Sequence, residues 1–496
     1  MKTLYTLFFS FVFLTTNLYS QFEDERNRYP KLNEGEFSLE SSQRITDPEE
    51  LDSLILSKME INHIPGLSAL IVKHDSIIWS RNFGYANLAL NHAVEDTTLF
   101  LMASISKTIM ITAIMQLWED GLFNLDDNIN DYLQPEFQVI NPLFPNDVIT
   151  FKMLMTHTSS IDDNWTVLNP LIVCGDSPIS LDSLLTNYFN PDGIYYDLAN
   201  FIGWSPNANG FHYTNVGSSI LAFLVEKLSG ITFDQYCKEN IFDPLEMKKS
   251  SLFLAGINSE EIATPYRWAN NLHYPYCHQG WPVYPVAFLR TNKIELLNFL
   301  LTYMHNGTYN GVTLLNSATV DTILTVYIAG YAQGLIWYKT NYGQGGLWGH
   351  AGQWLGCATG MYFHPEEGWG FMTFINLDSP SGIWLINSFI SEFAHSYIIS
   401  EVENEITLPV SYKLYQNYPN PFNPSTRIRY SVPQTSNVLV KVFDILGNEI
   451  ETLVNEEKST GTYEITWHAE ELPSGVYFYR LQAGDFVETK KMILIK

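Results

Sequence analysis

The sequence predicts an α/β domain, in which an antiparallel sheet is flanked by helices and interrupted by a mostly helical insertion, followed by a small all-β sandwich. Two observations predict the architecture of the first domain. Strand patterns recur near its two ends, at 67–81 and 335–376, and helical patterns dominate the residues between them. The third observation concerns the tail, where a Pro- and Asn-rich segment after Pro409 leads into short β-rich runs separated by turn signals.

Each element of the first domain has its own pattern. Ile105, Ile109, Ala113 and Leu117 recur every four residues, which predicts a buried helix that ends at Gly121. The other expected elements are, in chain order, a helix at 45–61, a hairpin of strands at 67–73 and 77–81, helical residues 151–158, irregular residues 160–210, a second buried helix at 216–228, strands at 335–338, 359–363 and 370–375, and a closing helix at 383–399.

Length and composition bound the class of protein. With 496 residues, the chain is long enough for one large domain and one or two small ones. Its 46% hydrophobic and 14% aromatic residues allow a large core and argue against a disordered chain. A formal net charge of −26 makes nucleic acid and anionic membrane surfaces poor partners.

Residues 1–20 have the pattern of a removable signal peptide. Lys2 precedes the apolar run Leu4–Leu14, and Ser20 is a small residue at the expected cleavage point. The run is shorter than the roughly 20 apolar residues that span a bilayer, and we expect no transmembrane segment elsewhere. Residues 21–44 are polar and are expected to form a linker.

Export makes disulfides possible, and the chain has four cysteines. Four cysteines allow three pairings, which spacing alone does not distinguish. Cys174 and Cys277 lie in loop-like segments with polar neighbours, whereas Cys237 lies in a helical pattern and Cys357 beside a strand, so the first two are the favoured pair. Because there is no Cys-x-x-Cys, a zinc knuckle is not indicated, and we expect neither a metal nor another cofactor.

A Ser-x-x-Lys motif, Ser104 to Lys107, opens the first buried helix. Three residues apart on a helix, the two side chains lie on one face, one turn from each other. The amine can then reach the hydroxyl, and a serine becomes a nucleophile when a neighbouring base takes its proton. Alone, the motif is better explained by a capped helix with an exposed lysine, so its meaning depends on the rest of the chain.

Two further motifs supply that context. Tyr213-Thr-Asn215 comes directly before the second buried helix, and His350-Ala-Gly352 lies among the late strands. Neither is specific alone, since Asn215 could simply cap its helix and His350 could be a buried structural histidine. Their order decides: Ser-x-x-Lys follows a hairpin, Tyr-x-Asn opens a second buried helix, and His-x-Gly enters a strand near the end of the domain.

This combination resembles the serine β-lactamase and penicillin-binding superfamily, in its class C-like branch, which also holds D-peptidases, esterases and amide hydrolases. Ile64-Pro-Gly-Leu, Leu154-Met-Thr-His-Thr-Ser-Ser and residues 236–247 add to the likeness, which covers roughly residues 45–400. The resemblance implies the architecture described above, with the active site between the sheet and the inserted helical domain.

The resemblance also implies roles for the motif residues. Ser104 would be the nucleophile, Lys107 a general base or the partner that keeps Tyr213 ionised, and Tyr213 the proton shuttle. The remaining residues would bind substrate, with the backbone N–H groups of Ser104 and Gln353 forming an oxyanion hole. These substrate-binding residues are Asn215, His350, Gly352 and Gln353.

Two positions depart from the family pattern. The third motif is usually Lys-Thr-Gly, and here His350 and Ala351 replace the cation and the hydroxyl that hold a substrate carboxylate. Because a histidine is only partly charged near neutrality, we expect neutral esters to be preferred to β-lactams, and the disadvantage of anionic substrates to narrow toward pH 6 as His350 gains a proton. Ser160 stands where relatives usually have Gly, and we expect only a local loop effect.

The tail has a resemblance of its own. Tyr418-Pro-Asn-Pro-Phe-Asn-Pro, Val442-Phe-Asp-Ile-Leu-Gly and Ser474-Gly-Val-Tyr-Phe-Tyr-Arg-Leu look like the C-terminal sorting domain of type IX secretion, over nearly all of residues 412–496. This implies the type IX machinery as a partner, and export through the periplasm and across a Gram-negative outer membrane to the cell surface or the medium. The alternative is an accessory β-module, for example one that binds a glycan.

Taken together, these features predict an exported serine hydrolase that forms an acyl-enzyme with small esters, amides or D-amino-acid peptides. The alternatives are a β-lactamase or DD-peptidase proper, or a slowly acylated binding protein on the same fold. The presence of Ser104, Lys107 and Tyr213 together favours an enzyme, because a pure binding protein need not keep all three.

Overall fold

The computed structural model describes residues 45–133, 137–208, 210–342, 345–406, 411–484 and 486–496. The expected signal peptide 1–20 and linker 21–44 lie outside the described residues. The chain divides into two compact units, with the division between Ala394 and His395.

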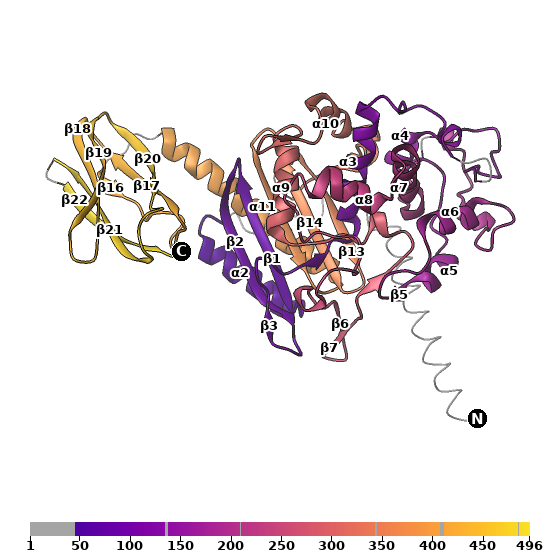
Figure 1. The fold of residues 1–496 in the computed structure, drawn as a ribbon, viewed down its shortest axis with the longest axis horizontal. Helices are drawn as coiled ribbons and strands as arrows, with labels where there is room; N and C mark the ends of the chain where they lie inside the picture. The colour runs from indigo at the N-terminus through magenta and orange to yellow at the C-terminus, as the bar shows by residue number, and fades with distance from the viewer. Residues whose placement is uncertain (1–44, 134–136, 209, 343–344, 407–410, 485) are drawn as a thin grey trace. The chain divides into compact units, whose positions relative to one another are not determined.

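A seven-stranded antiparallel sheet forms the centre of the first unit, in the order β12-β13-β14-β15-β1-β2-β3 (Figure 1). Strands from both ends of the unit pair directly, with Leu67 of β1 opposite Ile375 of β15. This confirms the sheet predicted from the strand patterns. Its strands are β1 (Gly66–Lys73), β2 (Ser76–Asn87), β3 (His92–Ala93), β12 (Tyr338–Thr340), β13 (Leu347–Trp354), β14 (Cys357–His364) and β15 (Trp369–Ile375).

Helices cover both faces of this sheet, and every residue of the central strands β14 and β15 is therefore buried. Helix α9 packs on β1, β14 and β15, while Asn387 of α11 lies against Gly360 of β14. The helices are α2 (Pro48–Ile61), α3 (Ser106–Glu119), α4 (Phe151–Met155), α5 (Trp165–Leu168), α6 (Leu181–Phe189), α7 (Asn215–Ser229), α8 (Phe233–Cys237), α9 (Lys293–Met304), α10 (Ser317–Ile323) and α11 (Pro380–Ile406).

The chain between β3 and β12 forms the mostly helical insertion, in which α3 packs on α7. Helix α3 is buried on almost all sides and ends before Gly121, whose φ of 73° suits glycine. The strand expected at 335–338 is wrong except at Tyr338, where β12 begins, because Ile336 has a left-handed φ of 65° that interrupts an extended chain. The insertion also holds short strands: β4 (Phe100–Leu101), β5 (Val173–Cys174), β6 (Tyr266–Ala269), β7 (Leu272–Pro275), β8 (Gln279–Gly280), β9 (Arg290–Thr291), β10 (Thr308–Tyr309) and β11 (Val312–Thr313).

The tail is a sandwich of two antiparallel sheets, β16-β17-β20 and β19-β18-β21-β22, as predicted. Its apolar core takes Ile428 and Trp467 from one sheet and Val440 and Leu481 from the other. The strands are β16 (Lys413–Leu414), β17 (Ser425–Val432), β18 (Ser436–Phe443), β19 (Glu449–Lys458), β20 (Gly461–His468), β21 (Gly475–Ala483) and β22 (Phe486–Leu494).

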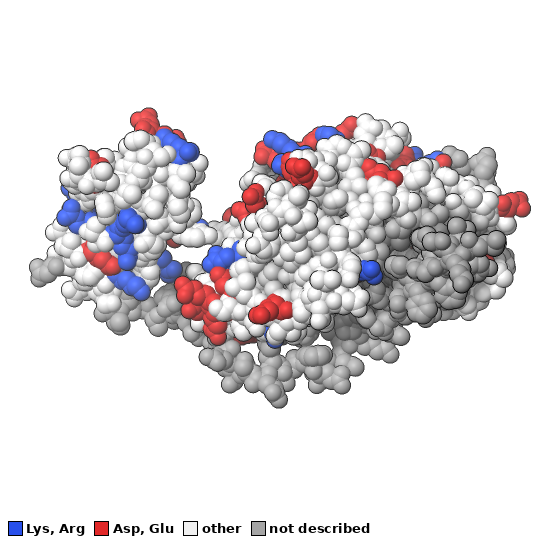
Figure 2. All heavy atoms as spheres, turned by 90° about the horizontal axis from the view of Figure 1, so that it is seen from below, with Lys and Arg blue, Asp and Glu red and all other residues white. Residues whose placement is uncertain are grey.

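The negative charge of the chain belongs almost entirely to the residues before the tail. Residues 412–496 contain nine Lys and Arg against ten Asp and Glu, which leaves the tail nearly neutral although the chain carries −26. On the face that Figure 2 shows, basic and acidic side chains lie side by side on the tail. The acidity is therefore a property of residues 1–411.

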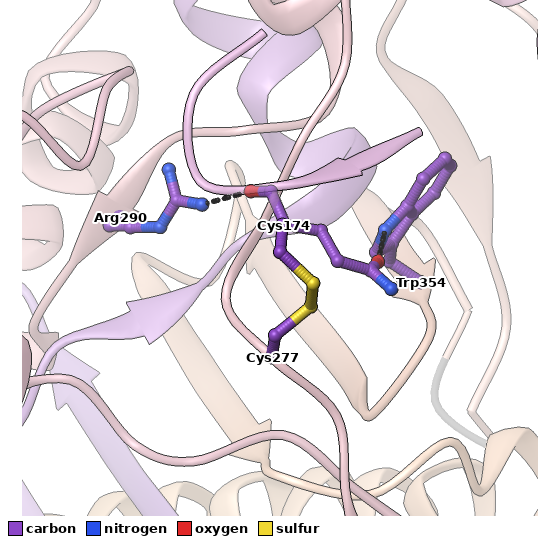
Figure 3. Close-up of a disulfide and its surroundings, with 5 residues drawn as sticks. Cys174, Cys277, Arg290 and Trp354 are labelled. Atoms are coloured by element: carbon purple, nitrogen blue, oxygen red, sulfur yellow. Dashed lines mark hydrogen bonds between the residues drawn. A yellow bond between two sulfur atoms is a disulfide. The ribbon is translucent and has the colours of Figure 1, made fainter. Parts of the chain in front are cut away.

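A disulfide joins Cys174 to Cys277, which confirms the favoured pair (Figure 3). It links two loops that also meet as strands, with Val173 opposite Gly280. Close to the disulfide, the Trp354 indole N–H at the end of β13 donates to Gln279 Oε1 at 2.8 Å. The disulfide therefore stabilises loops that are tied to the end of β13.

The two other cysteines allow a test of this pairing. Burial raises the pKa of the Cys357 thiol to about 12 and that of the Cys237 thiol well above its usual value, so both should resist alkylation near pH 8. We expect iodoacetamide to modify neither thiol in the folded protein and both after denaturation without reductant. Peptide mapping without reduction should recover Cys174 linked to Cys277, and a linked peptide that contains Cys237 or Cys357 would contradict the structure.

Candidate active site

Ser104 lies on a 3-10 turn, η1 (Ala103–Ile105), that leads directly into α3. Its side chain is half-buried between two buried neighbours. Ala103 has a φ of 47°, a left-handed conformation that costs an L-residue about 1–2 kcal/mol. Backbone strain of this kind collects at functional sites, and here it falls on the residue immediately before the serine.

The Lys107 amine is buried, with no exposed side-chain surface, and contacts three acceptors. Its Nζ lies 3.2 Å from Ser104 Oγ, 2.7 Å from Asn215 Oδ1 and 3.0 Å from the Val286 carbonyl oxygen on the short helix η8 (Tyr284–Val286). An ammonium group can donate to all three, whereas a neutral amine can donate to two and turn its lone pair toward the serine. Both protonation states leave the amine in proton-transfer distance of the hydroxyl.

The Tyr213 ring lies close to this amine, with its centre 4.9 Å from Lys107 Nζ. The His157 ring packs 4.4 Å from the tyrosine ring, and His157 Nδ1 accepts the Thr214 N–H at 3.4 Å. Burial, with a smaller contribution from the nearby Lys107, lowers the pKa of His157 well below its usual value. His157 is therefore a neutral packing partner of Tyr213.

Asn215 is the first residue of α7, and the cap of that helix is Thr214, whose side chain accepts the Gly217 N–H. Asn215 is therefore available for another role, and its amide oxygen receives the Lys107 bond. Its Nδ2 donates to Asp163 Oδ2 at 2.8 Å, which leaves one amide hydrogen for a substrate.

Asp163 belongs to the site although sequence reasoning assigned it no role. It lies in the stretch expected to be irregular, 52 residues before Asn215, and an Asp-Asp pair there looks like an ordinary polar loop. Val286 was missed as well, because it contributes only a backbone carbonyl, which carries no sequence signal.

Strand β13 brings the third motif to the serine. It pairs with β12 at Leu347–Gly349, and η1 packs against it. A Cβ on Gly352 would stand 2.2 Å from the Met102 carbonyl oxygen and 3.1 Å from the Ser104 nitrogen, so only glycine permits this approach. The Ser104 N–H thus lies beside the strand segment that carries Gln353.

His350 is buried, and its Nδ1 donates to the Ala351 carbonyl oxygen at 2.6 Å. Burial, aided by the nearby Lys107, lowers the pKa of His350 to about 3. His350 is therefore neutral from pH 6 to pH 8. This contradicts our expectation that it gains a proton toward pH 6 and then favours anionic substrates.

Ser160 has a backbone conformation that favours glycine. Its φ of 59° is left-handed, a conformation that glycine adopts without strain. Here the serine hydroxyl accepts a hydrogen bond from Asn141 Nδ2 at 3.0 Å inside the fold.

Ser104, Lys107 and Asn215 thus form one hydrogen-bonded group, with Tyr213 beside the amine and Gly352 beside the serine backbone. Among the described residues, no group of three or more His, Cys, Asp or Glu side chains is arranged to hold a metal ion. In the same residues no single helix is long and apolar enough to cross a membrane. One bent pair of helices, Asn215–Ser229 with Phe233–Phe242, has a suitable combined length and composition and nothing more.

The beta-lactamase family model matches residues 51–383, and the chain belongs to this family of serine hydrolases. A second model, the secretion system C-terminal sorting domain, matches residues 416–496 and indicates export by type IX secretion to the cell surface or the medium.

Among curated relatives, Penicillin-binding protein 4* of Bacillus subtilis is 24% identical over 257 residues, which cover 50% of this chain and 49% of that protein. Protein flp of Staphylococcus aureus is 23% identical over 67% of this chain and 63% of its own length. The chain therefore spans about half of the first relative and less than two thirds of the second.

Solved structures show the same fold at low identity. The octameric penicillin-binding protein homologue from Pyrococcus abyssi has a TM-score of 0.60 and 19% identity, covering 91% of this chain and 97% of that one. EstCE1, a hydrolase with promiscuous acyltransferase activity, has a TM-score of 0.55 and 17% identity, covering 70% of this chain and 98% of that one. A class C beta-lactamase has a TM-score of 0.56 and 18% identity, covering 69% of this chain and 95% of that one.

The contact at Gly352 can be tested by adding one carbon. Gly352→Ala places a methyl group against the Met102 carbonyl, so the strand and η1 must separate, at a cost of about 1–3 kcal/mol. We expect a lower thermal unfolding midpoint and loss of any reactivity of Ser104. Gly203→Ala is the matched control, because a Cβ there meets no atom within 4 Å. Wild-type behaviour of both variants would show that the approach is not required.

Proposed function

We propose that this protein is an exported serine hydrolase that acts through an acyl-enzyme on small esters, amides or D-amino-acid peptides. The observation that carries the proposal is the 3.2 Å separation between Lys107 Nζ and Ser104 Oγ, with the amine buried and held by two further acceptors. A serine hydroxyl needs such a fixed neighbouring base to become nucleophilic.

The proposed reaction has two steps. In the first, Ser104 gives its proton to neutral Lys107, or to ionised Tyr213 if Lys107 stays charged, and Oγ bonds to the substrate carbonyl carbon. The negative charge moves to the carbonyl oxygen, facing the N–H groups of Ser104 and Gln353. The carbonyl then re-forms as the bond to the leaving group breaks, and that group takes the proton that Lys107 or Tyr213 had accepted from Ser104. In the second, water gives a proton to Lys107 or Tyr213 and its oxygen bonds to the acyl carbon. The bond from that carbon to Ser104 Oγ then breaks as Oγ takes the proton back, which releases the acid and restores Ser104.

Neutral substrates suit this site best. Ala351 is exposed and has no hydroxyl, and buried neutral His350 supplies no cation, so a substrate carboxylate would lack a charged partner from this motif. Solved structures of the same fold include EstCE1 and a D-amino acid amidase from Ochrobactrum anthropi SV3, which supports small esters and amides. The penicillin-binding relatives keep a β-lactamase, a DD-peptidase or a slowly acylated binding protein as the alternative.

We assign these activities to separate parts of the chain. Catalysis falls to residues 45–400, since every proposed site residue precedes 354, and sorting falls to residues 412–496, which coincide closely with the matched sorting model. Residues 1–20 would be removed as a signal peptide and residues 21–44 would act as a linker.

The acyl-enzyme is tested by intact mass after exposure to a fluorophosphonate. We expect one adduct on Ser104, and Ser104→Ala should abolish it and lower ester turnover by about 10⁴-fold or more while leaving the circular dichroism spectrum unchanged. A chain that ends at Ile406, the last residue of α11, should be labelled at the same rate. An unlabelled wild-type protein would exclude the enzyme, and an adduct on another serine would exclude Ser104.

The substrate preference is tested by pH. The ratio of kcat/KM for a carboxylate-bearing and a neutral aryl ester should stay flat from pH 6 to pH 8, because the pKa of His350 lies at about 3. Neutral aryl esters should exceed cephalosporins by more than tenfold, since a lost charge-assisted hydrogen bond costs about 1.5–3 kcal/mol and about 1.4 kcal/mol is tenfold. A ratio that favours the anion toward pH 6 would show that His350 titrates, and equal turnover of cephalosporins would overturn the preference.

A further inference from the structure

The carboxylate of Asp163 contacts the start of α7. The side chain is 5% exposed and accepts hydrogen bonds from four neutral donors at 2.8–3.0 Å. The donors are the Thr214 hydroxyl, the backbone N–H groups of Asn215 and Val216, and Asn215 Nδ2. A carboxylate is well placed there, because the first N–H groups of a helix have no partner within it and carry a partial positive charge.

One of these four bonds decides how the Asn215 amide is turned. An ionised carboxylate can only accept, so the amide must direct its NH₂ group toward Asp163. Its oxygen then points to Lys107, where Nζ lies 2.7 Å away. The opposite orientation would set the NH₂ group against the amine and the amide oxygen against the carboxylate, which loses both hydrogen bonds.

The orientation of Asn215 in turn limits the Lys107 amine. Two of its contacts, Asn215 Oδ1 and the Val286 carbonyl, take two of the directions around the nitrogen, and a third lies toward Ser104 Oγ. If the amide turned, one of these two acceptors would be lost and the amine would be held less firmly toward the serine.

We propose that Asp163 is a positioning residue, which fixes the Asn215 amide so that Lys107 is presented to Ser104. This inference rests on the proposed function, because it concerns the reactivity of Ser104. If Asp163 only capped the helix, either Asp or Asn would serve at position 163. Asn caps a helix about as well as Asp does, whereas only an acceptor-only side chain fixes the Asn215 amide.

The direction of the bond between positions 163 and 215 is therefore the feature to test. Asp163→Asn keeps size and capping ability but allows two NH₂ groups to face each other. Asn215→Asp alone brings two carboxylates together. The double variant, Asp163→Asn with Asn215→Asp, reverses the bond, since the new amide donates to the new carboxylate, whose other oxygen can accept from Lys107. The number of carboxylates stays the same.

The measurement is the rate of acylation by a fluorophosphonate, a reagent without an amide for Asn215 to bind, together with the thermal unfolding midpoint of each protein. Each single variant should react about 100-fold more slowly, the scale for a misplaced reacting group, and the double variant at least about tenfold faster than Asp163→Asn. Asp47→Asn, at the cap of α2, is the matched control and should react at the wild-type rate.

The outcomes separate the two proposals. An unreactive wild-type protein overturns the proposed function and this inference with it. A reactive wild-type protein with an equally reactive Asp163→Asn variant, or a folded double variant no faster than Asp163→Asn, overturns the inference alone. If Asp163→Asn does not fold, Asn215→Ala decides, since it removes the link to Lys107 and leaves Asp163 its other three donors. Slow acylation of that folded variant supports the inference, and the wild-type rate overturns it.

Discussion

The rest of the site depends on the burial of the Lys107 amine. A buried polar group costs free energy unless it is hydrogen-bonded, and a charged one costs more. Lys107 meets this requirement with partners from three separate parts of the chain, namely Ser104 on η1, Asn215 on α7 and Val286 on η8. Each partner is held in turn by its own element, so the position of the amine depends on the packing of all three.

The second constraint is the close approach of β13 to η1. A strand with any side chain at position 352 would collide with the Met102 carbonyl, and the Thr359 hydroxyl, which donates to the same carbonyl at 2.9 Å, holds the next strand against it. The sheet therefore sets where the serine backbone lies, while the helical insertion sets where the amine lies. The proposed reaction needs both, which is consistent with a site formed where the two parts of the first unit meet.

The chain joins the beta-lactamase family domain to a C-terminal sorting domain. The matched sorting domain indicates export, and the disulfide is compatible with an oxidising environment outside the cytoplasm. The disulfide joins two cysteines that are 103 positions apart in the sequence. Gln279, beside it, accepts a hydrogen bond from the indole N–H of Trp354, the residue after Gln353. The segment that follows the proposed oxyanion position is thus tied to a covalently closed part of the fold.

The sequence by itself determined the elements and the motif residues whose signal is local. The period of four in α3, Gly121 at its end, the strand patterns near both ends of the first domain and the spacing of Ser104 and Lys107 are all local features of the sequence. The disulfide pair could also be favoured, because loop and helical surroundings differ along the chain.

Only the tertiary structure decided the remaining features, because they depend on residues far apart in the chain. Asp163 reaches Asn215 across 52 residues, and Val286 takes part through a backbone oxygen that any residue would supply. The charge of His350 was predicted wrongly for the same reason. Its motif position gives no measure of burial, and it is the surrounding fold, together with the amine of Lys107, that lowers its pKa and keeps it neutral.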